Sequence, residues 1–207
     1  EVNATTAGLP EPISTHVDGQ EVIRWSRRNL PAYHGGQKNG QQIPAVHISS
    51  MPDWRKVDAW YHDLFNPQTT ISDAVRREAA RIMEKSPTTL ERIGAVLRFV
   101  EQHVQYLGIE FGIGAYRPRP ASSTLAQGKG DCKDMTALMV ALLRSMKIDA
   151  YPVLIKPSEQ GPLLAEHPSP GQFSHVVMYV PHGDSGLWLD ATAGMGTLSA
   201  VPTALRG

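Results

Sequence analysis

The chain has 207 residues, of which 41% are hydrophobic, enough for a sizeable core in one domain, or in one domain plus a fragment of another. It carries 20 basic and 20 acidic residues without a long basic run, which argues against nucleic acid or an anionic membrane as the main partner. No apolar stretch approaches the roughly 20 residues needed to span a bilayer, and the single cysteine excludes an internal disulfide framework.

Residues 1–47 are polar and turn-rich, with a strand-like segment over residues 21–27 after the pair Asp18-Gly19 and a glycine-rich stretch through Gly35, Gly36 and Gly40. They hold too few apolar residues for a core of their own. We expect them to be the tail of an upstream β domain, or a flap packed on a main domain over 48–207. Because the chain lacks an initiating methionine and ends without a stop signal, we expect it to be a piece of a longer protein, truncated at its C-terminus.

Three helices are predicted next from capping residues followed by apolar residues at helical spacing. They open after residues 50–53, at Ser72, and at the capping box of Thr88 and Glu91. The aromatic stripe of the first helix is interpreted as packing rather than as a ligand site. The expected inward faces are Trp54, Val57, Trp60, Tyr61 and Leu64 in the first helix, Val75, Ala79, Ile82 and Met83 in the second, and Ile93, Val96, Leu97, Val100 and Val104 in the third.

The only cysteine, Cys132, directly precedes the strongest helical pattern in the chain, whose one apolar face is Met135, Leu138, Met139, Leu142, Leu143 and Met146. Asp131 is a suitable N-cap, and Asp134 can return a bond like that of a capping box. Cys132 is therefore expected in the first helical turn, where free backbone N–H groups and the helix dipole favour the thiolate. A single cysteine is more often a small buried hydrophobic residue, but its charged neighbours would make a poor core environment.

A histidine and an aspartate follow on two predicted strands, after a strand near residues 150–155 and a polar loop over residues 156–171. His175 interrupts an apolar strand, and Asp190 follows Leu187-Trp188-Leu189. If His182-Gly183 form a two-residue hairpin loop, His175 lies opposite Asp190. A four-residue loop shifts the register by two but keeps both on one face, together with Val177, Tyr179 and Trp188, whereas an odd-length loop separates them. The order cysteine, histidine, aspartate is that of a thiol triad, in which the carboxylate fixes the histidine tautomer.

Residues 116–134 and 137–153, together with the motifs around His175 and Asp190, resemble the bacterial transglutaminase-like core, over roughly residues 50–192. The resemblance implies an α+β, papain-like fold in which the Cys132 helix packs on an antiparallel sheet carrying His175 and Asp190. It also implies an upstream β domain in the same longer chain and a periplasmic or other extracytoplasmic location. The superfamily contains cross-linkers, peptidases, amidases and catalytically inactive scaffolds, so the resemblance leaves the reaction open.

The oxyanion of an acyl-transfer reaction needs hydrogen-bond donors. The backbone N–H of Cys132 is one. Papain-like peptidases carry a glutamine six positions before the cysteine, but here that position is Ala126, with Gln127 next to it. Transglutaminase-like relatives use an upstream aromatic side chain, for which Tyr106 is our candidate, although simple packing of Tyr106 is an equal alternative.

The long connection over residues 106–130, rich in glycine and proline, is expected to form a cleft wall before the nucleophile. Arg117 and Arg119 in this connection are interpreted as solvated or ion-paired rather than as ligands of a substrate carboxylate. Zinc would have only Cys132, His175 and Asp190 without a supporting ligand pair, so no metal or cofactor is expected.

These observations favour a thiol acyl-transfer enzyme with Cys132, His175 and Asp190 as its triad, acting on an amide bond of a peptide or protein. Hydrolysis is expected to exceed transfer to an amine. The alternative is a catalytically silent module that keeps the fold and binds a peptide or protein.

Overall fold

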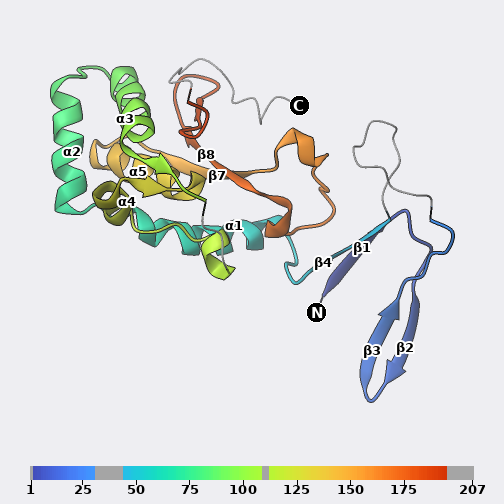
Figure 1. The fold of residues 1–207 in the computed structure, drawn as a ribbon. Coiled ribbons are helices and arrows are strands. Elements are labelled where there is room, and N and C mark those ends of the chain that lie inside the picture. The colour runs from blue at the N-terminus through green and yellow to red at the C-terminus, as the bar shows by residue number, and fades with distance from the viewer. Residues whose placement is uncertain (1, 31–43, 109–111, 195–207) are drawn as a thin grey trace. The chain divides into compact units, whose positions relative to one another are not determined.

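The computed structural model describes residues 2–30, 44–108 and 112–194 (Figure 1), and the chain forms two compact units. Unit 1 consists of residues 1–54 and 165–169, and unit 2 of residues 55–164 and 170–207. The glycine-rich stretch noted in the sequence and the last residues of the predicted core, from 195 onward, lie outside the described residues.

The fold is α+β, as predicted, with most helices and strands in separate runs: β1–β4 come first, α1–α3 follow, and β7–β9 come last. The helices are α1 (Trp54–Phe65), α2 (Asp73–Glu84), α3 (Thr89–His103), α4 (Ala121–Gln127) and α5 (Cys132–Ser145). The strands are β1 (Asn3–Ala7), β2 (Ile13–Val17), β3 (Gln20–Arg24), β4 (Ala45–Ser49), β5 (Gln105–Tyr106), β6 (Lys129–Gly130), β7 (Tyr151–Ile155), β8 (His175–Val180) and β9 (Leu187–Leu189).

Unit 1 contains two antiparallel pairs of strands, β1 with β4 and β2 with β3. Asp18 and Gly19 turn the β2–β3 hairpin with φ angles of 50° and 77°, the left-handed region that a tight hairpin requires. The strand expected over residues 21–27 is β3, which begins one residue earlier and ends at Arg24. Residues 165–169 join this unit through the buried His167, whose Nδ1 lies 3.0 Å from the Thr5 hydroxyl.

The helix starts of unit 2 follow the capping signals in the sequence. The Ser72 side chain accepts a hydrogen bond from the N–H of Val75 at the start of α2. Thr88 and Glu91 form the predicted capping box at the start of α3. The expected apolar faces of α2 and α3 are buried or half-buried, whereas α1 buries Val57 and Tyr61 of its predicted face and adds Phe65.

The cysteine helix α5 is the central helix of unit 2. We expected one buried face, but every residue from Cys132 to Leu143 is buried. The reason is its position, with α2, α3 and α4 packed against it and with β8 also in contact, so α5 has no solvent side over most of its length (Figure 1).

A three-stranded antiparallel sheet in the order β7-β8-β9 packs against α5. Its first strand confirms the strand predicted near residues 150–155. Val180 pairs with Leu187 and Tyr179 with Trp188, so the β8–β9 turn contains the six residues 181–186. The alternative of a two-residue loop at His182-Gly183 is therefore wrong, and the register is shifted by two residues, as expected for the longer even loop.

The connection over residues 106–130 is less irregular than its composition indicated. It contains a short 3-10 helix, Gly112–Ala115, and helix α4. Residues 109–111, which include Glu110, lie outside the described residues. At its ends, β5 pairs in parallel with β6, so the connection begins and finishes beside the start of α5.

Candidate active site

Cys132 is the first residue of α5 and is 5% exposed. Asp131 is the N-cap, and its side chain accepts from the N–H of Asp134, whose carboxylate in turn accepts from the N–H of Asp131. This capping box confirms the predicted helix start. The thiol consequently lies where the backbone N–H groups of a helix are unpaired and stabilise negative charge.

His175, the first residue of β8, lies beside Asp190, which follows β9. Its Nε2 is 2.8 Å from Asp190 Oδ2. The other carboxylate oxygen, Oδ1, accepts from the N–H of Thr192 at 2.9 Å and from the Thr192 hydroxyl at 2.7 Å. The register differs by two residues from that of a two-residue loop, but the turn has an even number of residues. Both side chains therefore stay on one face of the sheet.

The His175 ring interacts with Cys132 as well as with Asp190. Burial lowers the pKa of His175, but hydrogen bonds with Asp190 and Cys132, and the charges of both, outweigh burial and raise the pKa to about 10. Burial raises the pKa of the Asp190 carboxyl, but hydrogen bonds from His175 and Thr192 outweigh it and hold that pKa below its ordinary value. The imidazolium form of His175 is therefore favoured at neutral pH, between two groups able to carry negative charge.

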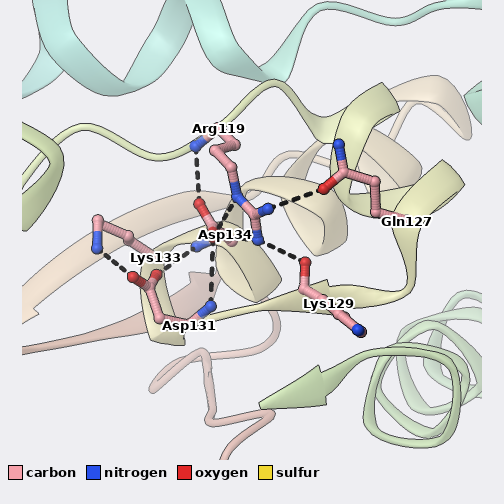
Figure 2. A network of polar contacts seen from close by, with 6 residues as sticks. All are labelled: Arg119, Gln127, Lys129, Asp131, Lys133 and Asp134. Atoms are coloured by element: carbon pink, nitrogen blue, oxygen red, sulfur yellow. Dashed lines mark hydrogen bonds and ion pairs between the residues drawn. The ribbon is translucent and has the colours of Figure 1, made fainter. Parts of the chain in front are cut away.

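The charged neighbours of Cys132 are buried, which the sequence had not indicated. Asp131, Lys133 and Asp134 are 2%, 2% and 4% exposed. Lys133 Nζ forms an ion pair with Asp131 Oδ2, and Arg119 donates to Asp134 from its backbone N–H at 2.7 Å and from Nε at 3.0 Å (Figure 2). Arg119 is thus ion-paired, as expected. A charged cluster can be buried here because each carboxylate has a cationic partner.

Two tyrosines of the sequence analysis lie in different settings. Tyr106 is 53% exposed on β5 and is paired in register with Gly130, two residues before Cys132. Tyr61, interpreted from the sequence as packing, is 6% exposed, and its hydroxyl has no hydrogen-bond partner in the described part of the chain. Burial, and then the negative charges of Cys132 and Asp131, raise the pKa of Tyr61 far above its ordinary value. The spacing of Tyr61 along its helix predicted packing and gave no indication that its hydroxyl would be buried without a partner among the described residues.

Within the described ranges, no group of three or more metal-ligating side chains is arranged to hold an ion. No helix in these ranges is long and apolar enough to cross a membrane.

Comparison with known proteins gives a family and a fold. The model of the transglutaminase-like superfamily matches residues 76–190, which contain Cys132, His175 and Asp190. No curated protein matches the chain at a significant level.

The solved structures that are similar to the chain include three described as proteases or a TGase. A candidate protease from Parabacteroides distasonis has a TM-score of 0.75 at 13% identity, over 91% of this chain and 37% of that one. A candidate cysteine protease from Cytophaga hutchinsonii has a TM-score of 0.47 at 15% identity, over 93% and 65%. A structure described as a TGase has a TM-score of 0.38 at 12% identity, over 89% and 44%. The first shows the same fold, in a chain of which the present one spans little more than a third.

Proposed function

Because the chain belongs to the transglutaminase-like superfamily, we propose that it is a thiol acyl-transfer enzyme acting on an amide bond of a peptide or protein. The observation that carries the proposal is the His175 ring, which interacts both with a cysteine at a helix start and, at 2.8 Å, with the Asp190 carboxylate. Nucleophile, base and orienting group are thus joined in one chain of contacts.

In the proposed reaction, the Cys132 thiol gives its proton to His175, and the sulfur attacks the amide carbonyl carbon and forms a carbon–sulfur bond. The carbonyl oxygen becomes an oxyanion, to which the backbone N–H of Cys132 and the Tyr106 hydroxyl are the proposed donors. When the tetrahedral intermediate collapses, the carbon–nitrogen bond breaks and the His175 imidazolium gives its proton to the departing amine. Asp190 holds the ring so that Nε2–H points at the carboxylate, and Nδ1 is the nitrogen that accepts and donates the transferred proton.

The thioester is then released to water or to an amine, and we propose that water is the main acceptor. In the water reaction His175 accepts a proton from water and the water oxygen bonds to the carbonyl carbon. The carbon–sulfur bond then breaks, and a carboxylic acid leaves as Cys132 is freed. The His175 side chain is 18% exposed, so solvent reaches the ring that would activate water. Tyr179 and Trp188 are paired across β8 and β9, on the same face of the sheet as His175, and their ring centroids are 4.9 Å apart. They could line a path for an amine's alkyl chain. Measuring acid and amide products with a primary amine present decides between the two acceptors, and a predominance of amide would make the protein a transglutaminase.

The test of the proposal is capture of the acyl-enzyme. The 207-residue protein is incubated with a library of glutamine-containing peptides and analysed by mass spectrometry, with Cys132→Ala as the matched control. We expect an acyl adduct on Cys132 that the control lacks, together with deamidated or cleaved peptide. Equal peptide binding by both proteins, with neither adduct nor product, would instead establish the binding module.

The wider setting is proposed from the same family relationship. Residues 1–47 would be the end of an upstream β domain of a longer chain, and the protein would act in the periplasm or another extracytoplasmic compartment. Fractionation of cells that express the full-length protein tests the location.

A further inference from the structure

Two buried carboxylates lie on either side of the candidate nucleophile. Asp131 precedes Cys132, and Asp134 follows it by two residues. Both stabilise the start of α5, because negative charge is favourable at a helix N-terminus. The same charges work against a thiolate on Cys132, since like charges repel most strongly where water is excluded.

Each carboxylate has its own cation. Lys133, itself 2% exposed, pairs through Nζ with Asp131 Oδ2. The Arg119 guanidinium lies 2.9 Å from Asp134 Oδ2 and also donates to the Lys129 carbonyl at 2.6 Å and to Gln127 Oε1 at 3.0 Å. Figure 2 shows both pairs at the start of α5, where Asp131 and Asp134 also hydrogen-bond each other's backbone N–H. Two negative and two positive charges make the cluster neutral.

A capping box by itself requires no buried cation. The box at the start of α3 is built from Thr88 and Glu91, whose side chains are exposed and which hydrogen-bond each other and the backbone. Burying an ammonium is costly even with a partner, so the presence of Lys133 at α5 calls for a reason beyond helix capping.

We propose that Lys133 and Arg119 are positioning residues that neutralise Asp131 and Asp134, so that the helix start still favours a thiolate at Cys132. The inference rests on the proposed function, because only a reactive thiol needs this balance. Among the described residues, the other ionisable groups that interact with Cys132 include His175 from β8, which is itself bonded to Asp190 after β9, and Tyr61 from α1. The cationic His175 balances one negative charge, so an unpaired Asp131 would add a charge that nothing else offsets.

The test is the pH dependence of Cys132 alkylation by iodoacetamide, which requires no substrate and no turnover. In Lys133→Met the midpoint of the profile should move to higher pH, so that the rate at about pH 6 falls about tenfold while the rate at high pH recovers. Lys85→Met, the same change at an exposed lysine at the end of α2, should leave the profile unchanged. The double variant Asp131→Asn/Lys133→Met removes both charges and keeps an N-cap, and should return the rate to within about threefold of wild type.

A Lys133→Met midpoint equal to that of wild type overturns the proposal. A rate reduced by the same factor at every pH also overturns it, because that is the mark of a purely structural role. If Lys133→Met does not fold, the same alkylation profile is measured for Arg119→Gln, which removes the cation of the more exposed Arg119–Asp134 pair. Failure of the proposed function gives a different result, namely a wild-type pH profile like that of an ordinary thiol that does not change in His175→Ala. The midpoints of Lys133→Met and wild type can still be compared in that case.

Discussion

Replacing Asp190 by asparagine tests the candidate triad with little change in shape. Oδ1 of Asp190 accepts from the Thr192 N–H at 2.9 Å, and this contact requires an acceptor. In Asp190→Asn the amide oxygen of the new side chain would therefore stay on Thr192, and its NH₂ group would face His175 Nε2, where the carboxylate now lies at 2.8 Å. An NH₂ group donates to Nε2 and so forces the proton onto Nδ1, the tautomer that cannot accept the thiol proton.

The size of the effect follows from the electrostatics of His175. Its pKa is raised from 6.5 to about 10 by Asp190 and Cys132 together, against the opposing effect of burial. A shift of this size corresponds to about 5 kcal/mol between the two protonation states. If Asp190 supplies about half of it, the variant loses roughly 2–3 kcal/mol, or on the order of 100-fold in the rate of Cys132 acylation at neutral pH.

The assay is single-turnover acylation together with the pH profile of iodoacetamide alkylation, with circular dichroism to verify the fold. The stability change has a defined pH window. The raised pKa of His175 contributes stability below 6.5 that is lost as pH rises toward about 10, and the lowered pKa of Asp190 contributes stability above 3.8 that is lost in acid. The stability difference between wild type and Asp190→Asn should therefore be largest between pH 3.8 and 6.5. Acylation within about threefold of wild type by a folded Asp190→Asn protein would refute the assignment of Asp190.

Three further outcomes are expected. His175→Ala should abolish the alkylation of Cys132 at pH values below the ordinary thiol pKa of about 8.5. If the thiol of that variant still reacts in mild acid, His175 does not activate Cys132. Tyr106→Phe should slow acylation by about 10²- to 10³-fold if its hydroxyl stabilises the oxyanion but leave alkylation unchanged, whereas an unaltered acylation rate would reduce Tyr106 to packing. Gly130→Ala should destabilise the fold by about 1–3 kcal/mol, because the new Cβ would lie 2.7 Å from Asp134 Cβ at the helix cap. Chemical denaturation measures this last effect, and an unchanged midpoint would show that the cap shifts without cost.

The sequence by itself determined the local features of the site. Helix starts depend on the side chains within a few residues, so Asp131 and Asp134 were sufficient to predict that Cys132 lies in the first turn of α5. The period of two along a strand depends only on residue numbering and the parity of the turn. This is why His175 and Asp190 could be placed on one face for any even-length turn before the register was known, and the structure supplied the even length.

The register itself required the tertiary structure, because the six-residue turn depends on packing that no short pattern encodes. Gly186 has a φ of +66°, and a Cβ there would lie 2.3 Å from the Tyr179 ring, so the turn is closed by a contact between strands. The burial of α5 on all sides is likewise a consequence of three helices and a sheet meeting there.

The charged cluster around Cys132 was also decided only in three dimensions. Asp131, Lys133 and Asp134 look like a solvated helix start when read along the chain. They can be buried because Lys133 pairs with Asp131, and because Arg119, fifteen residues before Asp134, is brought to the Asp134 carboxylate by the connection that leads into α5. Pairing between residues so far apart depends on the path of the backbone between them, and the residues near Cys132 do not predict that path.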